Sequence, residues 1–202
     1  MSAQLTTLEV ELALMKALNF RQNMIVPNVS WGISDGIKDL HECDLLVLSK
    51  SHYATEIEIK VTKHDLLRDK HKSHAHDHSY IKQLYYAVPK KLQNIALDNI
   101  PERAGLYVIN QSIRSNPDEK DNVNQPVKYF YTVERIRMPM KNNSAHKWTE
   151  SEVLQLLRLG SMRIYTMKNA MLRQKRPGLI TFFKTYVYDR IQEAKILGKV
   201  AI

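Results

Sequence analysis

Cysteine is almost absent from this chain. The single residue, Cys43, excludes an intramolecular disulfide framework and fits a reducing compartment. No apolar stretch approaches the roughly 18 residues that a membrane-spanning helix needs. The first residues also lack the basic segment and uncharged apolar run of a secretory signal. We therefore expect a soluble, cytoplasmic protein with no membrane partner.

Acidic residues are scarce in the last third of the chain. Residues 1–140 hold 18 Lys and Arg against 17 Asp and Glu, whereas residues 141–202 hold 12 against 4. A basic region attached to a nearly neutral body favours a polyanion partner, most often nucleic acid, although basic charge that serves solubility alone is the alternative. We expect a globular domain over 1–140 and a basic helical extension over 141–202.

Short apolar segments separated by turn residues predict an alternation of helices and strands. Residues 7–18 read as a helix with Thr7 as N-cap, and Thr62 with Asp65 and Thr149 with Glu152 match capping boxes that begin two more. Residues 114–126 have loop composition, and residues 140–147 read as a linker. The remaining predicted segments are strands over 25–31, 43–49, 54–61, 84–89, 104–110 and 128–137, a short helix over 90–96, helical sequence from Thr149 to Gln174, and a last helix over 179–197.

The first predicted helix carries a carboxylate on its apolar side. One broad face holds Leu5, Leu8, Leu12, Leu14, Met15 and Leu18. Glu11 falls near the middle of that face, whereas Glu9 falls outside it. Because a carboxylate directed at a core is costly unless something neutralises it, we single out Glu11.

The segment ATEIEIKV, residues 54–61, alternates charged and apolar side chains. Successive strand residues point to opposite faces, so Glu56, Glu58 and Lys60 share one face and the apolar residues share the other. The charged face is either an exposed edge with a Glu–Lys salt bridge or a functional site. We expect Glu56 itself to pair with a basic neighbour at the rim.

Asp44 begins the strand that precedes this segment. If the two strands are neighbours, Asp44 and Glu58 approach one point from adjacent backbones, with Lys60 beside them. Two carboxylates and the main-chain carbonyl of Ile59 are ligands suited to Mg²⁺ or Mn²⁺, and Lys60 would orient an attacking water. Such a set serves attack on a phosphodiester.

Asp44 followed by Glu58-Ile59-Lys60 on the next strand resembles the signature of the PD-(D/E)XK nucleases, with Cys43 in place of the proline before the aspartate. The resemblance implies an α/β fold with a restriction-endonuclease-like αβββαβ core, in which a mixed central sheet is flanked by helices. It also implies metal-dependent DNA hydrolysis, with Asp44, Glu58 and Lys60 catalytic and Glu11 matching an auxiliary helix glutamate. A non-cleaving nucleic-acid-binding protein that keeps this fold is the alternative.

A narrower likeness covers residues 40–110. The segments EIKVTKHDLLRDKHK, YYAVPKKL and IPERAGLYVI are similar to the MmcB-like group, whose members are described as DNA-repair or phage-associated nucleases. Basic residues near and beyond this region are expected to contact phosphates without reading base sequence. These are Lys63, Lys70, Arg158, Arg163, Lys168, Arg173, Lys175 and Arg176.

The segment HKSHAHDHS contains His71, His74, His76 and His78. Structural zinc sites normally take ligands from two separated pairs that include cysteine, which favours a solvated or phosphate-facing loop here. A metal-binding protein based on this loop and unrelated to nucleases is the third hypothesis.

Overall fold

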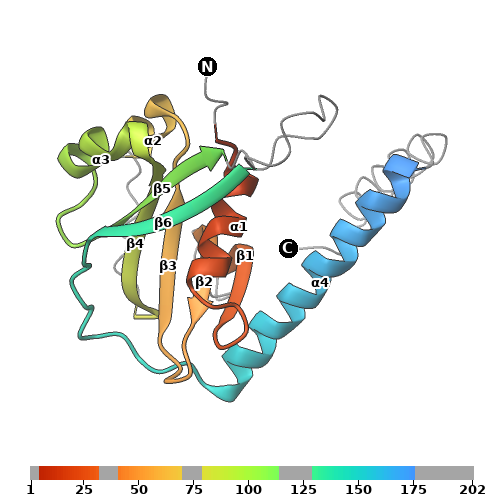
Figure 1. Ribbon diagram of the computed structural model, residues 1–202. Helices are drawn as coiled ribbons and strands as arrows, with labels where there is room; N and C mark the ends of the chain where they lie inside the picture. The colour runs from red at the N-terminus through yellow and green to blue at the C-terminus, as the bar shows by residue number, and fades with distance from the viewer. Residues whose placement is uncertain (1–4, 32–40, 70–78, 114–128, 176–202) are drawn as a thin grey trace, which may run out of the picture. The chain divides into compact units, whose positions relative to one another are not determined.

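The computed structural model describes residues 5–31, 41–69, 79–113 and 129–175 (Figure 1). The elements within these ranges follow the predicted alternation of helices and strands. In chain order they are α1 (Thr7–Ala17), β1 (Met24–Trp31), β2 (His41–Leu48), β3 (Ala54–Ile59), α2 (Lys63–Asp69), β4 (Ile81–Pro89), the 3-10 turn η1 (Lys90–Leu92), α3 (Gln93–Asn99), β5 (Gly105–Ile113), β6 (Tyr129–Arg137) and α4 (Glu150–Lys175).

The strands form one six-stranded mixed sheet in the order β1-β2-β3-β4-β5-β6. β3 runs parallel to β4, and β4 runs parallel to β5. The β1–β2, β2–β3 and β5–β6 pairs are antiparallel. The expectation of an α/β fold with a mixed sheet flanked by helices is therefore confirmed.

Two apolar clusters cover the two faces of the sheet, as the alternation of strand side chains requires. On one face Leu14 of α1 packs in a cluster with Leu45 and Ile57. On the other face Leu66 of α2 and Ala96 of α3 pack in a cluster with strand residues of β4 and β5. The sheet is thus enclosed between α1 and the α2–α3 pair, and β3 crosses the middle of the buried layer.

Helix α1 differs in detail from its prediction. Its N-cap is Thr6, not Thr7: the Thr6 hydroxyl accepts the Glu9 N–H, and the Glu9 carboxylate accepts the Thr6 N–H at 2.7 Å. Val10, Ala13 and Leu14 form the buried face, while Leu8 is 61% and Leu12 56% exposed. The small Val10 and Ala13 allow close contact with the sheet, so the buried face is rotated away from the leucine-rich side and Glu11 lies at its border.

Both predicted capping boxes mark real helix starts. The Thr62 hydroxyl accepts the Asp65 N–H at 3.2 Å before α2. The Thr149 hydroxyl accepts the Glu152 N–H at 3.4 Å, and the Glu152 carboxylate accepts the Thr149 N–H at 2.6 Å, before α4. The predicted loop over 114–126 and the predicted helix over 179–197 lie outside the described residues.

The segment between β6 and α4 contains no helix or strand, as predicted for a linker, but it is attached to the sheet. The Asn142 N–H donates to the carbonyl of Lys82, and the Trp148 indole donates to the carbonyl of Tyr80. By backbone contacts the chain divides into the compact units 1–156 and 157–202. The predicted division into a domain over 1–140 and an extension over 141–202 stays a prediction. No helix among the described residues is long and apolar enough to cross a membrane.

The start of β5 is a point of close packing. Gly105 pairs with Tyr85 across the β4–β5 ladder, and the Tyr85 ring stacks on Tyr107 at a centroid distance of 4.4 Å. A Cβ atom on Gly105 would overlap the Tyr85 ring and would lie 2.9 Å from the carbonyl oxygen of Arg137. Glycine at this position is therefore required by space rather than by backbone conformation.

We predict that Gly105→Ala lowers the free energy of unfolding by about 1–3 kcal/mol, because a buried aromatic ring must move to make room. Urea denaturation measures the change. Gly160→Ala in α4 is the matched control and should be neutral or stabilising by up to about 1 kcal/mol, since alanine is the better helix former. Equal effects of the two substitutions would contradict the packing argument.

Candidate active site

The charged face of β3 is buried, not exposed. β3 lies between β2 and β4 in the interior of the sheet (Figure 1). Glu56 is 0% exposed, and Glu58 and Lys60 are each 4% exposed. An exposed strand edge is therefore excluded as the explanation of the alternating sequence, and the prediction that Glu56 lies at a solvent-exposed rim is wrong.

Asp44, Glu58 and Lys60 come together where β2 begins and β3 ends. The Lys60 ammonium donates to Glu58 Oε2 at 2.7 Å and lies 4.0 Å from Asp44 Oδ2. The side chains of Glu58 and Lys60 are 5% exposed, whereas that of Asp44 is 37% exposed. The cluster is thus deep on the β3 side and opens to solvent at Asp44.

Main-chain hydrogen bonds fix this end of β3 from both sides. The Ile59 N–H donates to Asp44 Oδ2 at 2.8 Å. The next N–H, that of Lys60, donates to the carbonyl of Ala87 on β4 at 3.0 Å. Because one carboxylate oxygen of Asp44 is bonded directly to the backbone of β3, the separation of Asp44 from Glu58 is set by the sheet itself.

The pKa of Glu58 reflects opposing influences from its buried surroundings. Burial raises the pKa of Glu58, the Lys60 ammonium lowers it, and the carboxylates of Asp44 and Glu56 raise it again, with a raised pKa as the net result. The pairing with Lys60 therefore does not fully offset the desolvation and repulsion that Glu58 experiences. An additional positive charge at this point would stabilise the ionised form.

Glu11 of α1 interacts electrostatically with Asp44 of the same cluster. Its pKa is raised, first by burial and then by repulsion from Asp44. The carboxylate predicted from the helical pattern to face the core thus lies within electrostatic range of the strand carboxylate. The structure brings Glu11, Asp44, Glu58 and Lys60 into one electrostatic group.

The donor set fits a hard divalent cation whose coordination is completed by other oxygens. Within the described ranges, no three His, Cys, Asp or Glu side chains gather closely enough to form a metal site by themselves. Mg²⁺ in proteins is commonly held by one or two carboxylates while it keeps several waters or substrate phosphate oxygens. Asp44 and Glu58 supply that minimum, and the raised pKa of Glu58, which Lys60 does not fully offset, is the electrostatic feature that a cation would relieve.

The predicted phosphate-contacting residues lie on two helices. Lys63 is exposed in the first turn of α2, three residues beyond Lys60. On α4, Arg158, Arg163 and Lys168 are exposed and Arg173 is partly buried. Their five-residue spacing advances by roughly 140° around the helix at each step, so they surround α4 and do not form a single basic stripe.

Several predictions concern residues that the structure does not describe. Lys70, Arg176 and the histidine segment 71–78 lie outside the described ranges, and Lys175 is placed only as the last residue of α4. The third hypothesis, a metal site on the histidine segment, therefore stays a prediction.

The buried Glu56 is the member of the cluster whose setting the sequence analysis missed. Its charge repels that of Glu58 and raises the pKa of Glu58. The available signal was the position of 54–61 between two other apolar strand segments, which indicates a central strand with both faces covered.

Comparisons with known proteins leave the family open. No family model matches the chain, and no curated protein matches it. Among solved structures, it is similar to a protein of unknown function from Silicibacter pomeroyi, with 14% sequence identity and a TM-score of 0.46 over 84% of this chain and 90% of that one. A similarity at this level carries no functional assignment.

We predict that Glu11→Gln and Glu9→Gln, two residues apart on α1, change stability with opposite sign. Because the folded-state pKa of Glu11 is raised, ionisation of Glu11 opposes folding, and this penalty disappears as the pH falls below its unfolded pKa. Glu11→Gln should therefore stabilise the protein at pH 7 by less than about 1 kcal/mol, a value limited by solvent screening, and should be neutral near pH 3.

Glu9 provides the matched control. The Tyr131 hydroxyl and the Thr6 main chain and hydroxyl donate to its carboxylate and lower its pKa, so ionised Glu9 favours folding. Glu9→Gln should destabilise the protein at pH 7, and the difference should shrink as the pH falls through the lowered pKa. Urea denaturation in EDTA across pH 3–8 measures both changes, and effects of the same sign would refute the placement of Glu11 beside Asp44.

Proposed function

We propose that this protein is a metal-dependent nuclease of the PD-(D/E)XK type that hydrolyses DNA phosphodiester bonds. The observation that carries the proposal is the convergence of Asp44, Glu58 and Lys60 at adjoining ends of neighbouring strands, with the ammonium 2.7 Å from one carboxylate and 4.0 Å from the other. The burial of such a group in a central strand is costly, so its presence is best explained by function.

The order of elements supports the restriction-endonuclease-like core. The chain runs α1-β1-β2-β3-α2-β4, with β1 to β3 forming an antiparallel meander and β4 joining parallel to β3. This is the αβββαβ order that the signature implies, and Asp44 and Glu58 fall on the second and third of these strands, as the signature requires.

Three residues would supply the oxygen ligands of the metal ion. Asp44 and Glu58 would hold Mg²⁺ or Mn²⁺, which when bound polarises the phosphodiester and lowers the pKa of water. The N–H and C=O of one strand residue point to the same neighbouring strand. Because the Ile59 N–H faces Asp44, the Ile59 carbonyl is directed to the same side and completes the set of oxygen donors.

Lys60 and Glu11 act around these ligands. The Lys60 ammonium, held by Glu58, is placed to donate to an attacking water and orient it toward phosphorus. Glu11, partly exposed and electrostatically coupled to Asp44, is the auxiliary carboxylate that faces the same charge. In these roles the Lys60 ammonium and the Glu11 carboxylate would be held in position before the substrate binds. Such positioning of charged groups is the main contribution of a protein to phosphoryl transfer.

Nucleic acid is the substrate class that the charge distribution favours. Residues 141–202 carry a net excess of eight basic groups, and Lys63, Arg158, Arg163 and Lys168 are exposed. Lys175 and Arg176 continue this basic sequence. Contacts between such residues and phosphates would hold the strand without sequence preference and would weaken as salt is raised. The likeness to the MmcB-like group, and with it a role in DNA repair or phage DNA processing, stays a prediction.

We predict that Asp44→Asn and Lys60→Gln each reduce cleavage at least about 100-fold, because each removes a group that acts at the reacting phosphate. Labelled single-stranded, double-stranded and branched DNA are incubated with wild type and variants in Mg²⁺, Mn²⁺ or EDTA. Circular dichroism and thermal unfolding confirm that each variant is folded, and Lys16→Gln on exposed α1 surface controls for loss of one positive charge.

Cleavage that requires metal, survives Lys16→Gln and is lost in both site variants is the expected result. Wild-type rates in Lys60→Gln would overturn the assigned mechanism. Salt-dependent DNA binding with no products from wild type would instead identify the alternative, a nucleic-acid-binding protein that keeps the fold and does not cleave.

A further inference from the structure

Three exposed lysines, called here the lysine patch, lie at the edge of the sheet where β3 and β4 end. Lys63 lies in the first turn of α2, which follows β3, and Lys90 and Lys91 open η1 directly after β4 (Figure 1). Because β3 and β4 are parallel, the segments that follow them leave the sheet at the same edge. The Lys60 N–H joins the two strands there by donating to the carbonyl of Ala87 at 3.0 Å.

The elements that carry the lysine patch cover the face of the sheet to which the buried ion pair belongs. Glu58 pairs with Tyr86 across the parallel ladder, so their side chains share one face, and Lys60 shares it two residues further on. Tyr86 packs in the same apolar cluster as Leu66 of α2 and Leu92 of η1. The lysine patch and the Glu58–Lys60 pair are therefore on the same side of the sheet.

The charges of the lysine patch are not used within the described part of the chain. Its three side chains are exposed, and none of them forms a hydrogen bond or ion pair with another described residue. Asp65, the acidic residue in the first turn of α2, is paired with Arg68 at 3.2 Å instead. The first turns of η1 and α3 contain no acidic residue. The patch thus keeps its positive charge for a partner outside this part of the protein.

We propose that the lysine patch binds the phosphate backbone of the DNA on which the candidate active site acts. The inference rests on the proposed function for the choice of DNA as partner, and it places the DNA on the α2–η1 side of the sheet edge. Ligands of open α/β sheets bind outside the carboxyl ends of the strands. Since the carboxylates of Asp44 and Glu58 repel a polyanion, cations at the same edge favour its approach. Lysine contacts phosphates as a point charge, without reading the bases.

The lysine patch differs from the basic residues of α4 in its fixed relation to the candidate active site. α2, η1 and the site residues all belong to the compact unit 1–156, whereas α4 from Leu157 onward belongs to the unit 157–202. The sheet and its apolar cluster therefore set the position of the patch relative to Glu58. Lys90 and Lys91 extend the predicted phosphate contacts, which include Lys63 but neither of these two residues.

DNA binding without cleavage tests the lysine patch on the full chain. Fluorescence anisotropy of a labelled single-stranded and a labelled double-stranded oligonucleotide is measured in EDTA over a range of salt concentrations. The patch variant is Lys90→Gln with Lys91→Gln. The control variant is Lys50→Gln with Lys141→Gln, which also removes two exposed lysines. Circular dichroism and thermal unfolding confirm that both variants are folded.

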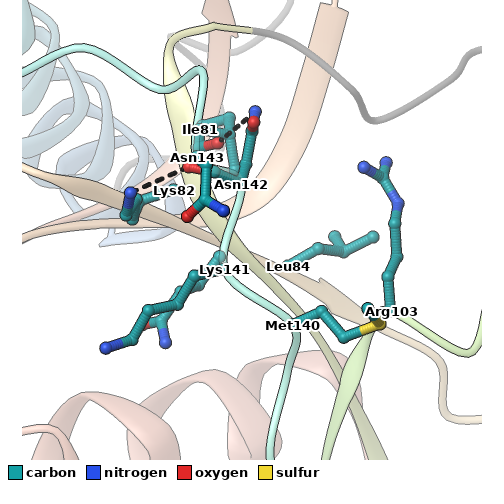
Figure 2. A pocket seen from close by; sticks show the side chains of 9 residues that line it. Ile81, Lys82, Leu84, Arg103, Met140, Lys141, Asn142 and Asn143 are labelled. Atoms are coloured by element: carbon teal, nitrogen blue, oxygen red, sulfur yellow. Dashed lines mark hydrogen bonds between the residues drawn. The ribbon is translucent and has the colours of Figure 1, made fainter.

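The control lysines lie at the opposite end of the sheet. Lys50 lies in the turn between β2 and β3, and Lys141 lines a pocket where β4 begins (Figure 2). Figure 2 shows the bonds that fix the segment around Lys141: the Asn142 amide donates to the carbonyl of Ile81, and the Lys82 ammonium donates to the carbonyl of Asn142. The two variants therefore remove the same charge and the same residue type from opposite ends of one sheet.

The patch variant should bind both oligonucleotides at least about tenfold more weakly at low salt. The slope of log affinity against log salt should become shallower by about 2, since two phosphate contacts are lost. The control variant should bind within about twofold of wild type and keep the wild-type slope. Equal weakening in the two variants, an unchanged slope in the patch variant, or failure of wild type to bind DNA overturns the proposal.

Cleavage assays on the same proteins in Mg²⁺ separate this proposal from the nuclease proposal. Asp44→Asn should lose cleavage and keep the patch-dependent binding in EDTA. Patch-dependent binding by a wild-type protein that does not cleave supports the lysine patch and overturns the nuclease. Metal-dependent cleavage with binding that is insensitive to the patch variant supports the nuclease and overturns the patch.

Discussion

The buried Glu58–Lys60 ion pair is the interaction on which the arrangement of the candidate site depends. Both side chains are almost fully removed from solvent on a central strand, where an ion pair rarely stabilises a protein more than apolar side chains of the same volume would. The pair persists because the sheet holds it: Ile59 bonds to Asp44 on one side, and Lys60 bonds to Ala87 on the other. The fold thus fixes charged groups that would otherwise separate into water.

Several carboxylates lie close to this ion pair and repel one another. The negative charges of Asp44 and Glu56 raise the pKa of Glu58. Asp44 also repels the carboxylate of Glu11 on α1 and raises its pKa. A divalent cation at Asp44 would offset this repulsion, and in the proposed reaction the phosphodiester would approach from the exposed side of Asp44.

Much of the fold was predictable because local signals agreed with the tertiary structure. The capping residues Thr62 and Thr149 mark helix starts, and the strict alternation in 54–61 separates the apolar face from the charged one. The buried face of α1 could not be predicted in the same way. The smaller Val10 and Ala13 pack against the sheet, and the larger Leu8 and Leu12 are exposed. The burial of Glu56 depends on the pairing of β3 with β2 and β4, which only the order of the apolar segments along the chain indicates.

The most direct measurement of the central claim is Mn²⁺ binding to the wild-type protein, followed by electron paramagnetic resonance. We expect one Mn²⁺ per chain, with affinity reduced at least about tenfold in Asp44→Asn, because a ligand is lost and not merely a supporting contact. The control Glu9→Gln removes a carboxylate of α1 that pairs with Thr6 and Tyr131 instead and should bind as wild type does. Equal affinities in wild type and Asp44→Asn would show that the carboxylates at the end of β3 do not form a metal site.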